Sequence, residues 1–251
     1  MTGSLVIAGL GPGNDAMITP QVQHALGHAT DIVGYIPYVE RISARPGLTL
    51  HPSDNRVEID RSRHALEMAA QGKHVVVVSS GDPGMFAMAA AVFEAVEQGA
   101  PHWRDLDIQV LPGITAMLAA SAACGAPLGH DFCAINLSDN LKPWALIDKR
   151  LRLAAEADFA MAFYNPRSKS RPEGFEKALK TLQDTCADSR PIIFARNVSR
   201  PDQTINIVPL PKATPDMADM RTIVLLGSSR TRIIERAGAP FVYTPRSVED
   251  E

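Results

Sequence analysis

The sequence predicts an α/β protein of two lobes, the first built on a mostly parallel sheet and the second on a mixed sheet. In the first half, short apolar runs alternate with helical patterns, which is typical of parallel strands joined by right-handed crossovers. Glycine-rich turns directly follow several of these runs. In the second half, the last strand-like runs follow one another with few helices between them, so antiparallel pairs are expected there.

The composition excludes several classes of protein. With 251 residues, 45% of them hydrophobic, the chain is long enough for one large core or two small ones. A net charge of −3 with mixed signs gives no reason to expect nucleic-acid binding. The histidines are scattered and the three cysteines form no CxxC, so we expect no metal and a reducing, cytoplasmic location. The first residues lack a basic segment, and no apolar run approaches ~18 residues, so neither a signal peptide nor a membrane span is predicted.

The first strand-like run, residues 5–8, leads into Gly9-Leu10-Gly11-Pro12-Gly13. Thr19 followed by Pro20 then predicts the start of a helix, because threonine caps a helix and proline suits its first turn. A glycine-rich loop after a first strand is compatible with dinucleotide binding, but these glycines follow GxGxG rather than GxGxxG. The acidic residue expected at the end of the second strand is also missing, since Asp31 stands at its start. A nicotinamide cofactor is therefore disfavoured.

A basic segment follows the second strand-like run, residues 31–35. It contains Arg41, Arg45, Arg56, Arg61 and Arg63. One interpretation is a solvated surface, and the other is a cationic wall for a polycarboxylate ligand, because arginine binds carboxylates through a planar fork. A helical pattern over residues 64–71, closed by Gly72, then leads into the next strand.

The stretch Ser79-Ser80-Gly81-Asp82-Pro83-Gly84-Met85-Phe86 organises the first lobe. It follows the apolar run 74–78, which is expected as a central strand, and precedes a helical pattern over residues 85–98. Its glycines allow a sharp turn and a close approach to a ligand. Asp82 stands at the carboxyl end of the strand, where open α/β sheets bind ligands. Its carboxylate suits a hydroxyl or an amine, and the alternative role is a helix N-cap.

A strand at residues 107–111 ends in Pro112-Gly113-Ile114-Thr115-Ala116, and the Pro-Gly pair predicts the boundary between the lobes. The expected domains are residues 1–113, residues 114–245 and a short tail, 246–251. Thr115 is either the N-cap of the helix that follows or a ligand hydroxyl. Further strands are expected at residues 132–137, 159–164, 192–195, 203–207 and 222–226, and a helix at 144–155 capped by Ser138 or Asp139.

Four motifs cover the chain nearly from end to end: Gly9-Leu10-Gly11-Pro12-Gly13, Gly81-Asp82-Pro83, Pro112-Gly113-Ile114-Thr115-Ala116 and Gly125-Ala126-Pro127-Leu128. Together, and in this order, they resemble the SAM-dependent tetrapyrrole methyltransferases of cobalamin and sirohaem synthesis. Residues 34–40, 79–85, 128–133 and 164–168 are similar to members that act on precorrin-3B, with Asn165-Pro166-Arg167-Ser168 the most discriminating piece.

The resemblance implies two α/β lobes with S-adenosyl-L-methionine (SAM) in the cleft between them, usually in a homodimer. S-adenosyl-L-homocysteine (SAH) is the implied product. The implied cofactor contacts are Pro12, Ser80, Gly81, Asp82, Met85, Thr115, Ala116, Asn165 and Val198. Sister methyltransferases often carry Met where Asn165 stands and Gly where Val198 stands.

The implied reaction is methylation of precorrin-3B at C17 with ring contraction to precorrin-4, in aerobic cobalamin biosynthesis. Contraction needs proton movement, and the candidate groups are Tyr38, Glu40, His130 and Asp131. The last two residues have an alternative role as a turn before a strand. Candidates for binding the substrate carboxylates are Arg41, Arg45, Arg167 and Arg171.

Three alternatives stay open. The substrate can be cobalt-factor III of the oxygen-independent route, although the sequence shows no Cys-rich segment, which favours the precorrin. A nucleotide-dependent oxidoreductase is weakened by the missing fingerprint. A tetrapyrrole carrier without catalysis is disfavoured by the intact cofactor motifs, and SAH binding discriminates it from an enzyme.

Overall fold

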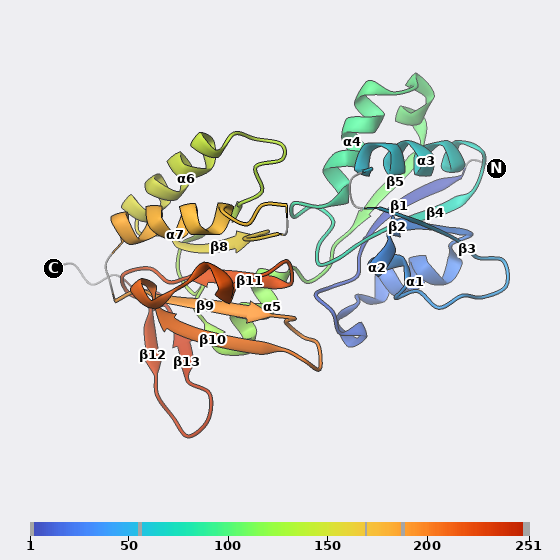
Figure 1. Ribbon diagram of the computed structural model, residues 1–251. Coiled ribbons are helices and arrows are strands. Elements are labelled where there is room, and N and C mark those ends of the chain that lie inside the picture. Colours follow the sequence, from blue (N-terminus) through green and yellow to red (C-terminus); the bar gives the residue numbers. More distant parts are fainter. Residues whose placement is uncertain (1–2, 55–56, 169, 187–188, 248–251) are drawn as a thin grey trace. The chain divides into compact units, whose positions relative to one another are not determined.

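The computed structural model describes residues 3–54, 57–168, 170–186 and 189–247 (Figure 1). The chain divides into unit 1, Met1–Thr115, and unit 2, Ala116–Glu251. This division falls close to the lobe boundary expected after Gly113. Most of the expected tail, Val248 to Glu251, lies outside the described residues.

Unit 1 holds a five-stranded sheet in which every pair of neighbouring strands is parallel. In the order β3-β2-β4-β1-β5, the strands are Thr49–Ser53, Asp31–Tyr35, His74–Ser79, Ser4–Gly9 and Asp107–Leu111. The helices are α1 (Pro20–His28), α2 (Ile36–Val39), α3 (Glu58–Ala70) and α4 (Met88–Gln98), with 3-10 turns η1 (Asp15–Met17) and η2 (Pro101–Asp105). Because the strands run parallel, their carboxyl ends meet at one edge, and those of β4, β1 and β5 are neighbours.

The valines of β4 explain why it is central. Val75 and Val77 pack with α3 and α4 on one face, whereas Val76 and Val78 pack with α1 and α2 on the other (Figure 1). Alternate side chains of a strand point to opposite faces, so a continuous apolar run fits only a strand covered on both sides. The predicted parallel sheet is confirmed.

Two helix starts in unit 1 differ from expectation, and one agrees. Thr19 caps α1, where its hydroxyl accepts a hydrogen bond from the Val22 N–H at 3.3 Å. The helix expected from Met85 begins only at Met88, because Phe86 has a left-handed backbone (φ 53°) that a helix does not allow. Helix α3 starts at Glu58, ahead of the expected His64.

Unit 2 holds a mixed sheet, as predicted. In the order β10-β9-β11-β8-β7, its strands are Thr204–Pro209, Pro191–Arg196, Thr222–Leu226, Ala160–Tyr164 and Phe132–Asn136. Only β7 and β8 pair in parallel, and the other neighbours are antiparallel. A small sheet joins β12 (Arg232–Ile234), β13 (Phe241–Tyr243) and β6 (Gly125–Ala126). The helices are α5 (Ala116–Cys124), α6 (Trp144–Glu156) and α7 (Gly174–Thr185), with turns η3 (Leu210–Lys212) and η4 (Pro215–Met217).

The main core of unit 2 lies between the mixed sheet and the pair α6 and α7 (Figure 1). Phe163 and Phe175 are fully buried there, and the ring of Phe175 meets that of Phe194 edge-on at 6.0 Å. The expected cap of α6 is wrong: no side chain caps this helix, which follows Pro143. Instead, the Ser138 N–H donates to Oδ1 of Asn136 at 2.9 Å, which closes a turn at the end of β7.

Candidate functional site

Three loops of unit 1 are joined at the carboxyl edge of its sheet. They follow β1, β4 and β5, whose order in the sheet makes them neighbours. Gly11 and Gly81 exchange two backbone hydrogen bonds, at 3.2 and 2.9 Å. The Leu10 N–H also donates to the Ser79 carbonyl at 2.8 Å. The first and central loops therefore behave as one hydrogen-bonded unit.

Glycine is required where these loops touch. A Cβ placed on Gly113 would lie 2.2 Å from the Gly81 carbonyl oxygen and 2.8 Å from that of Gly9. A Cβ on Gly9 would meet the same Gly81 oxygen at 2.6 Å. All three distances are far inside van der Waals contact, and the obstacle is backbone rather than a flexible side chain. The glycines thus let three backbones meet at one point.

Asp82 ties the central loop to the loop after β5. Its Oδ1 accepts a hydrogen bond from the Gly84 N–H at 2.9 Å, and its Oδ2 accepts one from the Gly113 N–H at 3.1 Å. Because α4 begins only at Met88, the alternative role of Asp82 as a helix N-cap is wrong. Its half-buried carboxylate fixes the loop geometry while keeping further acceptor capacity for a ligand.

We expect Asp82→Ala to weaken SAH binding by about tenfold, because it removes the Gly84 and Gly113 bonds together with a charged acceptor. Asp107→Ala is the control, since this exposed aspartate lies at the amino end of β5, at the opposite edge of the same sheet. Isothermal titration calorimetry with SAH measures both. Equal dissociation constants for the Asp82 variant and the wild type would contradict the assignment.

The other unit 1 residues expected at the cofactor lie on the same three loops. Pro12, Gly81 and Thr115 are buried, and Ser80 and Met85 are half-buried. Tyr38 and Glu40 belong to the segment after β2, the strand beside β4. The Tyr38 ring meets that of Tyr35 edge-on at 5.3 Å, and Glu40 is exposed.

Arg41 and Arg45 contact carbonyl oxygens of unit 1. Nη2 of Arg41 donates to the Leu10 carbonyl and to Oδ1 of Asp15, both at 3.0 Å. Nη2 of Arg45 donates to the carbonyls of Leu26, at 3.1 Å, and Ala29, at 2.6 Å, where α1 ends. Arg41 therefore braces the first glycine-rich loop and Arg45 caps a helix. The buried Nη1 of Arg41 has no hydrogen-bond partner among the described residues, and the substrate role expected for these two arginines stays a prediction.

In unit 2, the residues expected at the cofactor and substrate gather where β8 and β9 end. Asn165, Asn197 and Ser199 have left-handed backbones, with φ of 51°, 49° and 67°. Such strain in residues other than glycine is typical of functional loops. Val198 is buried between two of them, and Arg167 is half-buried beyond Asn165.

Asn136, which the sequence did not single out, holds Asn165. Its Oδ1 accepts a hydrogen bond from Nδ2 of Asn165 at 3.2 Å, which orients the Asn165 amide and leaves acceptor capacity on its Oδ1 for a ligand. Arg171 donates from Nη1 to the Asn165 carbonyl at 3.4 Å. Ala116 begins α5, and the next N–H, of Met117, donates to the Tyr164 hydroxyl at 3.2 Å. The sequence feature that could have identified Asn136 is its place at the carboxyl end of a predicted strand.

His130 and Asp131 lie at the other edge of this sheet. They precede β7, at its amino end, whereas Asn136 and Asn165 lie at the carboxyl ends of β7 and β8. Five residues of strand separate the two places by ~16 Å. His130 Nδ1 is 3.7 Å from Asp131 Oδ2, and Asp131 is 82% exposed. The structure does not bring this pair together with the strained loops.

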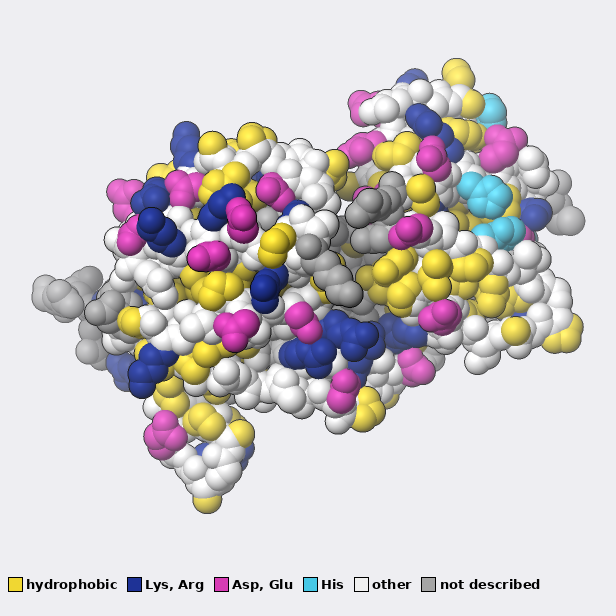
Figure 2. Space-filling model, in the orientation of Figure 1, with side chains coloured by type: hydrophobic (Ala, Val, Ile, Leu, Met, Phe, Trp, Pro, Cys, Tyr) yellow, Lys and Arg dark blue, Asp and Glu magenta, His cyan; other side chains and the backbone are white. Residues whose placement is uncertain are grey.

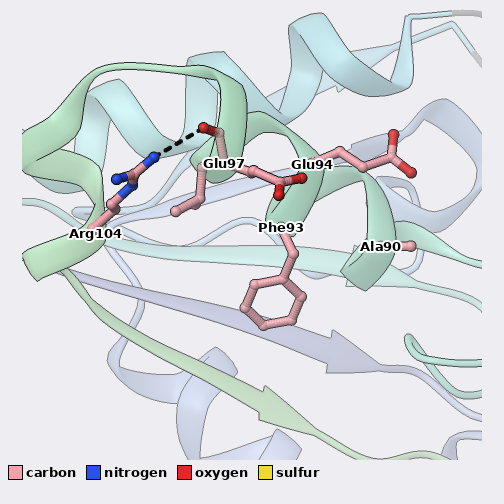
Figure 3. Close-up of a pocket in the computed structure, with 6 residues that line it drawn as sticks. Ala90, Phe93, Glu94, Glu97 and Arg104 are labelled. Carbon is pink, nitrogen blue, oxygen red and sulfur yellow. Dashed lines mark hydrogen bonds between the residues drawn. The ribbon is translucent and has the colours of Figure 1, made fainter.

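A surface hollow of about 590 Å³ lies on the outer side of α4 (Figure 3). Its lining is Ala90, Phe93, Glu94, Val96, Glu97 and Arg104, and none of these was a candidate site residue. Among the residues that the structure describes, no three His, Cys, Asp or Glu side chains form a metal-binding group. None of the described helices combines the length and apolar character needed to cross a membrane.

Comparison with known proteins gives consistent matches. The family model of the Tetrapyrrole (Corrin/Porphyrin) Methylases matches residues 4–214. The chain is 51% identical over 247 residues to the Precorrin-3B C(17)-methyltransferase of a Sinorhizobium species, covering 98% of this chain and 97% of that protein. The crystal structure of the methyltransferase CobJ matches with a TM-score of 0.93 and 64% identity, covering 97% of this chain and 100% of that one. The Probable cobalt-factor III C(17)-methyltransferase of Salmonella typhimurium is 36% identical, covering 96% of this chain and 98% of that protein.

Proposed function

Because the chain belongs to the tetrapyrrole (corrin/porphyrin) methylase family, we propose that it transfers the methyl group of SAM to C17 of precorrin-3B, with contraction of the ring to precorrin-4. The observation that carries the proposal is the similarity, over almost the whole of both chains, to the Sinorhizobium enzyme. The lower identity to a cobalt-factor III enzyme makes the oxygen-independent route the second candidate.

The residues at the carboxyl edge of unit 1 fit SAM. A cofactor with a sulfonium and an ammonium group calls for an anionic acceptor, and Asp82 supplies one among the otherwise neutral side chains Ser80 and Thr115. The hydrogen-bonded backbones of the three loops form a rigid cradle, which the missing Cβ atoms of Gly9 and Gly113 make possible. When bound, SAM supplies an electrophilic methyl group. Pro12, Gly81 and Met85 complete the proposed cofactor contacts of unit 1, and Ala116, Asn165 and Val198 are the proposed cofactor contacts of unit 2.

The protein's main contribution to methyl transfer is positioning. An electron-rich carbon of the macrocycle needs little acid–base help to attack a sulfonium methyl group, so rigid loops that fix the reactants supply most of the effect. Contraction converts a tertiary hydroxyl to a ketone and requires a proton acceptor. We assign that role to Tyr38 or Glu40, since they follow the strand beside β4. Because His130 and Asp131 lie at the other edge of unit 2, we give them no part in it.

Two arginines of unit 2 are proposed to contact the substrate. Arg167 follows the strained Asn165, and Arg171 holds the Asn165 carbonyl. Their guanidinium groups suit the carboxylate side chains of a tetrapyrrole.

The test is incubation of the purified protein with precorrin-3B and SAM, followed by mass spectrometry and absorption spectroscopy. We expect one added methyl group, one equivalent of SAH and a changed chromophore, and no change when SAM is omitted. Methylation of cobalt-factor III but not of precorrin-3B would establish the second candidate instead. Reaction with neither substrate would contradict the proposed reaction, and a lack of SAH binding as well would indicate a carrier.

We further propose that the protein is a cytoplasmic homodimer. Exposed large apolar side chains on unit 2, among them Leu118, Ile233, Ile234 and Phe241, support self-association. The three cysteines are free thiols, which suits a reducing compartment. Sedimentation velocity at micromolar concentration measures the oligomeric state.

A further inference from the structure

Three arginines lie together at the edge of unit 2 where β9 ends. Arg196 is the last residue of β9 and is paired in register with both Thr204 and Thr222, the first residues of β10 and β11. Arg221 immediately precedes β11, and its carbonyl accepts a hydrogen bond from the Asn197 N–H at 3.0 Å. Arg200 lies in the loop between β9 and β10. We call Arg196, Arg200 and Arg221 the arginine edge. Figure 2 shows Lys and Arg side chains gathered over this end of the β9–β10 hairpin.

The loop that carries Arg200 is held in a fixed shape. The left-handed backbones of Asn197 and Ser199 turn the chain sharply, and hydrogen bonds stabilise this turn. Nδ2 of Asn197 donates to Oδ2 of Asp202 at 2.6 Å, the Ser199 N–H donates to Oε1 of Gln203 at 2.7 Å, and the Arg200 N–H donates to the Asn197 carbonyl at 3.0 Å. A loop fixed in this way holds the backbone of Arg200 in one place, which lowers the cost of ordering the loop on binding.

The neighbouring carboxylates are already occupied by hydrogen bonds. Asp219 accepts from Nε of Arg196 at 2.8 Å, from the Arg221 N–H at 2.9 Å and from the Thr222 hydroxyl at 2.8 Å. The other carboxylate, of Asp202, is bonded to Asn197.

Donors of the arginine edge therefore remain for a ligand. Nη1 and Nη2 of Arg196, and the guanidinium groups of Arg200 and Arg221, have no hydrogen-bond partner among the described residues. Three cations against two carboxylates leave a net positive charge. The side chain of Arg196 is 41% exposed, and those of Arg200 and Arg221 are exposed.

We propose that the arginine edge binds carboxylate side chains of the tetrapyrrole substrate. This inference rests on the proposed function. The edge continues the row of strained loops, because the carboxyl ends of β8 and β9 and the start of β11 lie along one side of the sheet. Guanidinium groups carried on a fixed backbone suit several carboxylates on one rigid macrocycle. Asp219 orients Arg196 so that its two Nη groups remain for the ligand.

The test compares two double variants of the full chain with equal changes of net charge. Arg200→Ala with Arg221→Ala removes two cations of the edge, and Arg232→Ala with Arg246→Ala removes two exposed arginines elsewhere in unit 2. Binding of uroporphyrin III, a stable tetrapyrrole with eight carboxylates, is followed by its fluorescence, and SAH binding by calorimetry. A KM-against-kcat split with precorrin-3B completes the measurements.

We expect the edge variant to bind uroporphyrin about tenfold more weakly than the control, at about threefold for each exposed ion pair, with the difference shrinking in high salt. KM should rise while kcat and SAH affinity stay unchanged, and Arg200→Lys should recover only part of the affinity. Equal uroporphyrin affinity in the two double variants would overturn the inference. An equal loss of SAH affinity would also overturn it, by indicating a structural role. If wild-type protein leaves precorrin-3B unchanged while the edge variant still loses uroporphyrin affinity, the proposed function fails and the binding edge stands.

Discussion

Gly113→Ala is expected to reduce SAH affinity by more than tenfold and to destabilise the protein by about 1–3 kcal/mol. The new Cβ would lie 2.2 Å from the Gly81 carbonyl oxygen, and this backbone is already fixed by its two bonds to Gly11. Either the loop after β5 moves away or the central loop does. Movement would also break the hydrogen bond from the Gly113 N–H to Asp82. Calorimetry with SAH and thermal unfolding measure the two effects.

Gly27→Ala is the matched control for this substitution. Gly27 lies within α1, and a Cβ there meets nothing within 4 Å. Because alanine favours a helix over glycine by ~1 kcal/mol, this variant should be slightly more stable than the wild type and bind SAH equally well. If Gly113→Ala binds SAH as tightly as Gly27→Ala does, the three loops do not form the cofactor cradle.

Asp31→Asn is expected to lower the free energy of unfolding by about 2–3 kcal/mol at neutral pH without changing SAH affinity. The side chain is 3% exposed, and Oδ1 is bonded to Nε2 of His51 at 2.7 Å and Nζ of Lys73 at 3.0 Å. Oδ2 accepts a hydrogen bond from the Thr30 hydroxyl at 2.8 Å. This cluster lies at the amino end of β2, away from the three loops, so a loss of stability should leave the cofactor site intact.

The contribution of Asp31 should depend on pH. Burial alone would raise the pKa of this carboxyl, but the hydrogen bonds from His51, Lys73 and Thr30 and the charge of Lys73 hold it below its usual value. With a folded-state pKa below that of the unfolded chain, the stabilisation is complete above the unfolded value of ~4 and is lost as the pH falls through the folded value. Urea unfolding of the wild type and the Asn variant between pH 7 and pH 3 should therefore show a stability difference that shrinks below about pH 4. A stability difference that stays constant with pH would show that the Asp31 charge has no such role. Asp60→Asn is the control: because this side chain is exposed, the substitution should leave the free energy of unfolding almost unchanged at any pH.

The sequence was most informative where the local structure depends on residues that are adjacent in the chain. The consecutive valines of β4 identified a strand buried on both faces, and Thr19 with Pro20 located the start of α1. The glycine-rich turns located the loops that meet at the edge of unit 1. These features follow from side-chain periodicity and from backbone freedom, and both depend on only a few consecutive residues.

Elements with weaker local patterns were missed. Strand β3 contains Pro52 and is an outermost strand of its sheet, so its sequence does not show a continuous apolar run. The small sheet is made of strands of two and three residues, which are too short to show a period. The start of α4 depends on the left-handed backbone of Phe86, which no sequence pattern predicts.

Which side chains face one another was decided only by the tertiary structure. Asp82 bonds Gly113 because β4, β1 and β5 are neighbours, and Arg41 and Arg45 contact carbonyls that lie far from them in the sequence. His130 and Asp131 precede a strand whereas Asn165 follows one, so strand direction places them at opposite edges of the sheet. Arg196 and Arg221 meet through antiparallel pairing of β9 with β11. Strand order and direction result from packing of the whole core, and for this reason local sequence identified the loops but not the contacts between them.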